Sequence, residues 1–514
     1  MSTRALRLYN STEQALLVGA DTRLAAYAPT AGDGATVSER ALIVSSASAE
    51  ATLLDTLHRI ERLLRQAERY IQAGTGDPVY LGLATDPASG VEYRSLVHDG
   101  SVRVKPTALV SELAARRLAL EVMWKRADWF EGPESEIPLT NSTGTGVLGG
   151  LAVWNPTPAI TSAGLHFQAL ANRIDDANSK LACFCTGDSI RISGSLANNG
   201  ACTVADGGHA GYLITAEALV EEDPGMLVTI CGGLNNHVEI AAADLAGALP
   251  FPLRLELTSE TLDRGGSAYV GIGGWHDVAQ MPPRVSLATG AGTLDDDTCI
   301  DGRYWHATWN DTAEARLKST ALTTALFRAA AGEQFLALLR LRAKTAMTDL
   351  WLKLQIELNA SGPVLWSGPW VQATTATFLQ ELGTLRLPPF LAGPEDIDSA
   401  ELCLYAKSYS AGAHALDLDG IFLLPVECFR HYIPVDSASL AEDESLTDDS
   451  ISGYLYTTFS GCKRQTYVAY GSPLGLWPGR KQRIYIVADS QAGTADITRT
   501  LRVRAFYRER RRTL

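Results

Sequence analysis

The chain has 514 residues, of which 46% are hydrophobic and 20% are charged. That length exceeds what one hydrophobic core usually supports, and the composition excludes a disordered chain, so two to four folded domains are expected. The net charge of −14 argues against a general nucleic-acid binder, because phosphate binding needs lysines and arginines clustered on one face.

Targeting signals are missing from the sequence as given. No run of about 18 apolar residues occurs, which predicts no membrane insertion. The N-terminal MSTRALRLYNSTEQ lacks the apolar core of a signal peptide, so we expect synthesis in, and retention by, the cytoplasm.

The first clear element is a helix over residues 49–73. Apolar side chains recur every three or four residues and predict one buried stripe: Leu53, Leu57, Ile60, Leu64, Ala67 and Ile71. Ser48 would cap its start, Gly74 would end it, and i,i+4 charge pairs would lie on its wet side, namely Asp55 with Arg59 and Glu61 with Arg65. A coiled coil is the rival interpretation, but only three heptads precede a Gly-Asp-Pro, which favours a helix laid on a sheet.

Strands surround that helix. They are expected at 40–45, 78–84, 91–97, 101–106 and 117–124, and Asp99-Gly100 between two alternating runs predicts a β-hairpin. The result is a first domain, residues 1–137, of sheet plus one helix.

The next region reads as all-β. A stretch rich in Gly, Ser and Thr over 134–153 marks a boundary, and a sandwich module is predicted for 138–281, with 156–236 as a candidate insertion. Leu253, Leu255 and Leu257 should point inward, because they alternate with polar residues.

A jelly-roll sandwich fits residues 282–435 best. Within it, Leu352, Leu354, Ile356 and Leu358 are expected on the buried side of a strand, and Lys353, Gln355 and Glu357 on the other. Residues 436–514 should form a closing hairpin, either as a small fourth domain or as strands returning to the first. The fold class is therefore mainly β: several β-sandwich or jelly-roll domains with one amphipathic helix.

No constellation of catalytic residues is present in the sequence, and the nine histidines are scattered singly, so an enzyme is not expected. Acidic runs at 295–297 and 395–398 could in principle hold two carboxylates at glycosidase spacing, but solvated loops explain them better. The arginines at 508, 510, 511 and 512 suggest a solvated chain end or a subunit contact, with an anionic partner as the alternative.

Two pairs of residues are candidate binding sites. Asp417 and Asp419 alternate on a strand and could supply oxygen ligands to calcium, although hydrogen-bonded edge carboxylates are the preferred interpretation. Trp366 and Trp370 bracket a Ser-Gly-Pro and could stack on a sugar, although packing in a core or interface is preferred.

The eight cysteines do not have zinc-site spacing. Cys183 and Cys185 are interpreted as buried thiols on one strand face. A bridge from Cys202 to one of them is the open alternative.

Taken together, these segments resemble phage and prophage tail-associated proteins, akin to siphophage distal tail proteins that carry added carbohydrate-binding-type sandwiches. In the first domain the resemblance rests on LLDTLHRIERLLRQAERY, PVYLGLA and RRLALEVMWKRADWFEGPESEIPLTN. In the third region it rests on VLWSGPWVQ, LGTLRLPPF and ALDLDGIFLLPVECFRHY, and at the C-terminus on GSPLGLWPGRKQRIYIVAD and ITRTLRVRAFYRERRR.

The resemblance covers most of the chain and is weakest at 156–236. It implies a non-catalytic virion tail protein, assembled in the host cytoplasm, whose first domain forms a hexameric ring. Other tail proteins and a host-surface glycan are the implied partners. No aromatic sugar platform can be mapped beyond Trp366 and Trp370. The alternative function is a glycan-binding adhesion module with no ring-forming role.

Overall fold

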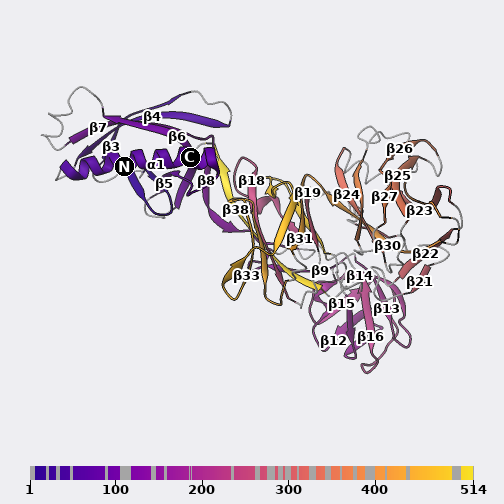
Figure 1. Ribbon diagram of the computed structural model, residues 1–514. Coiled ribbons are helices and arrows are strands. Elements are labelled where there is room, and N and C mark those ends of the chain that lie inside the picture. Colours follow the sequence, from indigo (N-terminus) through magenta and orange to yellow (C-terminus); the bar gives the residue numbers. More distant parts are fainter. Residues whose placement is uncertain are drawn as a thin grey trace. The chain divides into compact units, whose positions relative to one another are not determined.

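The structure of the protein is a computed structural model, which describes most of the chain. The described residues are 6–18, 22–30, 35–46, 50–86, 91–104, 117–140, 146–155, 159–184, 186, 188–232, 237–260, 267–274, 284–286, 293–295, 303–309, 312–322, 332–341, 349–358, 362–373, 379–387, 400–410, 412, 414–435, 440–488 and 499–512. Within them the protein is mainly β, as predicted, and α1 (Glu50–Ala73) is the one α-helix (Figure 1). The chain divides into two compact units. Unit 1 comprises Met1–Ser135, Ala246–Phe251 and Tyr507–Leu514, and unit 2 comprises Glu136–Leu245 and Pro252–Phe506.

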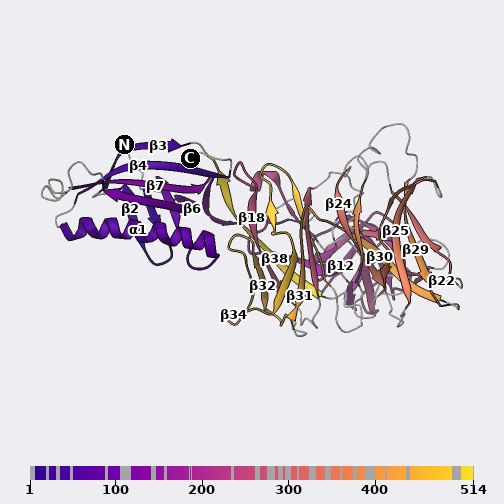
Figure 2. The same cartoon turned by 45° about the horizontal axis from the view of Figure 1, so that its top comes forward.

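Unit 1 is an antiparallel sheet with the helix against one face (Figures 1 and 2). In spatial order its strands are β2 (Gln14–Val18), β1 (Leu6–Tyr9), β5 (Tyr80–Asp86), β6 (Val91–Val104), β7 (Arg117–Ala127), β4 (Thr36–Ser46) and β3 (Thr22–Thr30), with β8 (Phe130–Glu136) also beside β6. The long strand β6 joins the two halves, because its first part pairs with β5 and its second part with β7. The core therefore lies between the curved sheet and the helix.

The helix begins and ends close to the predicted bounds. Its apolar stripe is buried at Leu53, Ile60, Leu64 and Ala67, although Ile71, at its far end, is 43% exposed. The two predicted charge pairs on the wet side are formed, Arg59 with Asp55 at 2.5 Å and Arg65 with Glu61 at 2.6 Å. Gly74 ends the helix in the left-handed region at φ +64°, and its N–H donates to the Tyr70 carbonyl. Ser48 lies outside the described residues.

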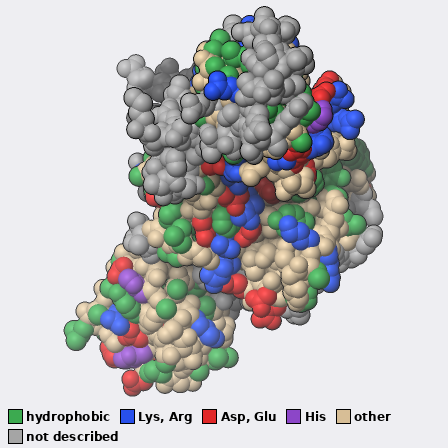
Figure 3. Space-filling model, turned by 90° about the vertical axis from the view of Figure 1, so that its left-hand side faces the viewer, with side chains coloured by type: hydrophobic (Ala, Val, Ile, Leu, Met, Phe, Trp, Pro, Cys, Tyr) green, Lys and Arg blue, Asp and Glu red, His purple; other side chains and the backbone are tan. Residues whose placement is uncertain are grey.

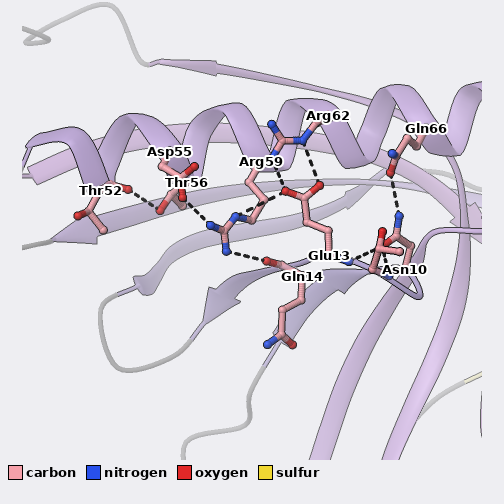
Figure 4. A network of polar contacts seen from close by, with 10 residues as sticks. Asn10, Glu13, Gln14, Thr52, Asp55, Thr56, Arg59, Arg62 and Gln66 are labelled. Carbon is pink, nitrogen blue, oxygen red and sulfur yellow. Dashed lines mark hydrogen bonds and ion pairs between the residues drawn. The ribbon is translucent and has the colours of Figure 1, made fainter.

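A polar network fastens the β1–β2 hairpin to the helix (Figure 4). The guanidinium of Arg62 donates to the Glu13 carboxylate, with 3.1 Å between Nε and Oε2, and that of Arg59 donates to the Gln14 carbonyl at 3.3 Å. The amide of Asn10 donates to Gln66 at 2.9 Å. The hydrogen bond from Arg62 lowers the pKa of Glu13 below its ordinary value.

The hairpin predicted at Asp99-Gly100 is wrong. Strand β6 runs continuously through both residues, and its register against β7 shifts between Val97 and Asp99, as in a β-bulge. A glycine is required because β6 passes very close to its neighbours: a Cβ on Gly100 would stand 2.5 Å from the Met123 carbonyl oxygen and 2.8 Å from Leu64.

Unit 2 contains a central pair of antiparallel sheets. One is ordered β9 (Leu151–Asn155), β38 (Arg499–Arg511), β18 (Phe251–Ser259), β32 (Ser445–Asp449), β33 (Tyr454–Phe459) and β34 (Cys462–Arg464), with β36 (Gly475–Leu476) on β18. The other is ordered β17 (His237–Ile240), β37 (Gln482–Ala488), β19 (Ala268–Gly274), β31 (Cys428–Pro434) and β35 (Tyr467–Gly471). The sheets meet where Arg430 and Tyr432 of β31 each donate to Asp448 of β32 at 2.9 Å.

The alternation of residues along the sequence correctly predicts the buried face of β18. Leu253, Leu255 and Leu257 of β18 are at most 2% exposed. On β38, the alternating Leu501, Val503 and Ala505 are at most 1% exposed.

A seven-stranded body occupies the chain between β9 and β17. Its order is β10 (Ala159–Ser162), β16 (Val228–Gly232), β13 (Ser189–Ser193), β14 (Gly200–Asp206), β15 (Tyr212–Thr215), β12 (Arg173–Asp176) and β11 (Leu165–Gln168). Short 3-10 turns lie at Leu181–Cys183 and, beyond the body, at Ala242–Asp244. The flanking strands β9 and β17 belong to the central sheets. The chain therefore leaves these sheets after β9, forms the seven-stranded body, and returns to them at β17.

A two-sheet sandwich occupies the chain between β19 and β31. One sheet is ordered β21 (Thr293–Asp295), β22 (Arg303–Trp309), β30 (His414–Pro425), β24 (Gln334–Leu341) and β28 (Leu379–Arg386), with β20 (Arg284–Ser286) on β30. The other is ordered β23 (Ala315–Leu322), β29 (Ala400–Ser408), β25 (Leu350–Leu358) and β26 (Val364–Ser367), with β27 (Val371–Gln372) on β25. One apolar core fills the space between the sheets.

Candidate functional site

The outer face of the sheet β23-β29-β25-β26 gathers aromatic and charged side chains. Because side chains alternate along a strand, Leu352, Leu354 and Ile356 of β25 enter the core and are fully buried. The residues between them, and those of β29 that pair beside them, face outward. We call this surface the aromatic–lysine face and define it by Trp351, Lys353, Trp370, Tyr405, Lys407 and Tyr409.

Two lysines on neighbouring strands lie against the indole of Trp370. The Lys407 ammonium is 4.3 Å from the ring centroid and the Lys353 ammonium is 4.6 Å from it. Lys353 is also 5.2 Å from the ring of Tyr405 and donates to Glu314 at 2.7 Å. Lys407 is 5.6 Å from the ring of Tyr409. Each contact has cation–π geometry.

Two of the outward-facing residues of β25 are nevertheless buried. Lys353 is 7% exposed and Glu357 is 4% exposed. The rings of Trp370 and Tyr405 lie against the Lys353 ammonium, and the hydroxyl of Tyr405 donates a hydrogen bond to the Glu357 carboxylate. Gln355, which lies between them, is partly exposed.

A denser charge cluster adjoins Tyr405. Arg316 of β23 donates to Glu401 and, at 3.1 Å, to the Cys403 thiol, and it lies 3.8 Å from Glu357. Burial, reinforced by Glu357, raises the pKa of the Cys403 thiol to about 12, so this cysteine is a neutral thiol and not a nucleophile at physiological pH. Burial and the hydrogen bond to Glu357 likewise raise the pKa of Tyr405.

The two tryptophans proposed together as one candidate sugar site have different surroundings in the structure. Trp366 lies on β26 opposite Ile356 and packs against the sandwich core. Trp370 lies beyond β26 and faces the two lysines on the outer side of the sheet. The ring neighbouring this site is Trp351, which meets Tyr409 edge to face with centroids 6.3 Å apart.

The two candidate calcium ligands have different partners. Asp417 Oδ1 is 2.6 Å from His306 Nδ1, and Asp419, which is 1% exposed, forms an ion pair with Arg340 of β24. Among the described residues no group of three or more His, Cys, Asp or Glu side chains could hold a metal. Calcium binding at these aspartates stays a prediction.

The remaining candidates from the sequence are cysteines and acidic runs. Cys183 and Cys202 are buried free thiols, and Cys185 lies outside the described residues. The acidic residues at 296–297 and 395–398 also lie outside them.

The C-terminal arginines face acidic partners. Arg508, Arg510 and Arg512 pair with Glu134, Glu131 and Asp128, and Arg511 pairs with Glu509. Basic and acidic side chains also lie side by side on the described surface in Figure 3.

The seven-stranded body carries a second surface that the sequence did not reveal. Three loops lie together at one end, 169–172, 194–199 and 216–227, because Thr215 N–H donates to the Asn172 carbonyl and Asn198 accepts from Val220 N–H. Apolar side chains protrude from all three: Leu170 is fully exposed, Leu196 75%, Leu227 68%, Val220 54% and Met226 42%. We call this surface the apolar loop end.

A buried carboxylate makes several hydrogen bonds to one loop of the apolar loop end. The Glu222 carboxylate, 8% exposed, accepts from the Ser195 hydroxyl at 2.6 Å, the Leu196 N–H at 2.8 Å and the Asn198 amide at 3.0 Å. These donors lower the pKa of Glu222 although burial opposes them, so the carboxylate is ionised at neutral pH. Leu196 therefore lies on a loop that is hydrogen-bonded to a buried carboxylate.

Comparisons with known proteins identify no family. No protein-family model and no curated protein matches the sequence. A structure of infectious bursal disease virus strain Gx is similar over 71% of this chain and 83% of that one, with 11% identity and a TM-score of 0.16. Derived T=1 particles of that virus match at 11% identity over 71% of this chain and 79% of that one, with a TM-score of 0.17. Likenesses this weak carry no functional argument. No described helix is long and apolar enough to cross a membrane.

Proposed function

We propose that this protein is a non-enzymatic structural component of a bacteriophage tail, of the distal-tail or baseplate type. Unit 1 would form an oligomeric ring, with six copies as the expected number, and the sandwiches of unit 2 would be displayed for contact with other tail proteins and the host surface. The protein would be assembled in the host cytoplasm and carried in the virion.

The observation that carries this proposal is the apolar loop end. Contiguous exposed apolar side chains on a soluble protein usually mark a contact surface. Here Leu170, Leu196 and Leu227 protrude from three loops that hydrogen bonds join, and the buried Glu222 carboxylate accepts hydrogen bonds from the loop that carries Leu196. Preorganised loops lose little conformational entropy when they bind, which suits a permanent assembly contact.

Unit 1 supports the ring in a different way. Among the described strands, β3 hydrogen-bonds to β4 alone, so its other edge has no strand partner in that part of the chain. Leu24 and Tyr27 on this strand are 41% and 47% exposed. An open edge beside exposed apolar groups suits a head-to-tail contact, which closes into a ring when the rotation between subunits permits.

Light scattering and electron microscopy of the purified full chain test the proposal. Rings, or a mass of about six copies, are expected. Replacing Leu24 with Lys on the β3 edge should lower the copy number, because a charge at an open edge opposes strand addition. A stable monomer with no association with phage particles would contradict the proposed role.

The alternative function is glycan binding without ring formation, and the aromatic–lysine face favours it. Exposed rings beside charged groups are typical of sugar sites. The two functions differ in a measurable way, since a pure adhesion module would bind glycan as a monomer.

A further inference from the structure

We propose that the aromatic–lysine face binds a carboxylated saccharide, of the uronate or sialate class, with the Lys407 ammonium receiving the carboxylate. The inference rests on the proposed function, in which unit 2 displays its sandwiches to the host surface, and it names the ligand class for one of them.

The first step is the unmatched charge of Lys407. On the same face, Lys353 is paired with Glu314 and Arg316 with Glu401. Within the described part of the chain, no carboxylate lies within 4.0 Å of the Lys407 ammonium, whose partners are the rings of Trp370 and Tyr409. Aromatic rings stabilise a cation without neutralising it, so this ammonium can still gain a charge-assisted hydrogen bond from an incoming anion.

The second step is the shape of the surroundings. Tyr409 is 70% exposed, and Trp351 and Trp370 are half-buried with part of each side chain open to solvent. Trp351 and Tyr409 stand nearly perpendicular, at 87°, so they present surfaces in two directions. Sugars bind such sites by laying their C–H faces on aromatic rings while a few polar groups fix their orientation. A saccharide seated here would bring its own carboxylate close to Lys407.

The third step is charge selection. The chain as a whole carries a net charge of −14, which disfavours nonspecific binding of polyanions. Only a ligand held close to Lys407 gains from its charge, because screening limits that attraction to about 8–10 Å at physiological salt. A neutral sugar would use the rings alone. The face should therefore prefer an acidic sugar to its neutral counterpart.

The experiment compares two matched probes on the full-length protein in its native assembly state. Isothermal titration calorimetry and saturation-transfer NMR would measure binding of an oligogalacturonate and of its methyl ester, and then of sialyllactose and of lactose. We expect at least one acidic probe to bind about tenfold more tightly than its neutral partner, because one charge-assisted hydrogen bond contributes on the order of 1.5 kcal/mol.

Three variants complete the test. Lys407→Gln should reduce the affinity for the acid to that of the neutral probe and leave the latter unchanged. Tyr409→Ala should weaken both. Lys463→Gln is the matched control, because Lys463 lies 4.1 Å from the Tyr456 ring in the central sheets and makes the same kind of contact elsewhere. It should change neither.

Equal affinity for acid and neutral probes, no binding of any probe, or unchanged binding by Lys407→Gln would each overturn the inference. Light scattering on the same samples measures the oligomeric state, so the saccharide site and the ring are tested independently. A ring that binds no acidic sugar refutes the saccharide site alone, and a monomer that binds one refutes the ring alone.

Discussion

Individual side chains in unit 1 show how a buried charge is kept satisfied. Glu39, 3% exposed, accepts hydrogen bonds from the Trp124 indole at 2.7 Å, from the Arg126 guanidinium at 2.6 and 2.9 Å, and from the Tyr27 hydroxyl at 2.5 Å. A buried carboxylate with this many donors fixes the position of each of them. The network therefore sets the register of β3, β4 and β7 at the end of the sheet that bears the open edge.

Tyr27 gives a prediction about pH. The partial burial of its side chain, and then its hydrogen bond to Glu39, raise its pKa from 10 to about 12. A raised pKa means that the folded state holds the Tyr27 proton more tightly than the unfolded state does. The contribution of the protonated Tyr27 hydroxyl to folding stability is therefore complete below pH 10 and is lost as the pH rises toward 12. Tyr27→Phe should lower the urea midpoint at about pH 8, because it leaves Glu39 one donor short, and the difference from the wild type should shrink between pH 10 and 12. A difference independent of pH would contradict this assignment.

At the scale of elements, the close passage of β6 over β7 and α1 leaves no room for a side chain at Gly100. Gly100→Ala should destabilise unit 1 by about 1–3 kcal/mol, because the added methyl group would overlap backbone that cannot move independently. Denaturant unfolding, with hydrogen exchange of the α1 amides, measures the change. Gly211→Ala is the control, since a Cβ there meets nothing within 4 Å and the backbone is not in the left-handed region, and it should be nearly neutral. Equal effects at both positions would contradict the steric argument.

The sequence predicted elements well where the signal is local. The alternation of Leu352, Leu354 and Ile356 determines a buried face whatever the strand pairs with, and the stripe of α1 is equally self-contained. The β-hairpin predicted at Asp99-Gly100 was wrong because the same dipeptide occurs both in hairpin turns and in β-bulges. Only the strand that pairs with this segment decides between the two.

The surroundings of the candidate sites could not be predicted from the sequence, because they depend on contacts between distant segments. Trp370 meets Lys407 across 37 positions, a separation that gives no periodic signal. The leucines of the apolar loop end each stand alone in a polar loop, and they become a surface only when pairing of β12, β14 and β15 brings their loops together. The size and turn position of Trp370 made it a candidate in the sequence, but they gave no information about its partners.

At the scale of the molecule, unit 1 is assembled from both ends of the chain. Residues 507–514 belong to it with residues 1–135. Tyr507 packs on Phe251 with ring centroids 4.7 Å apart, and Arg510 donates to Glu131 at 2.7 Å. Removing residues 507–514 should therefore lower the stability of unit 1 by about 3 kcal/mol or more, as loss of a buried aromatic side chain does, while β25 in unit 2 keeps its hydrogen-exchange protection. Arg511→Ala, which removes one exposed ion pair, is the control and should cost at most about 1 kcal/mol. If α1 remains as protected after the truncation as before it, the C-terminal strand is an appendage and unit 1 folds from the N-terminal residues without it.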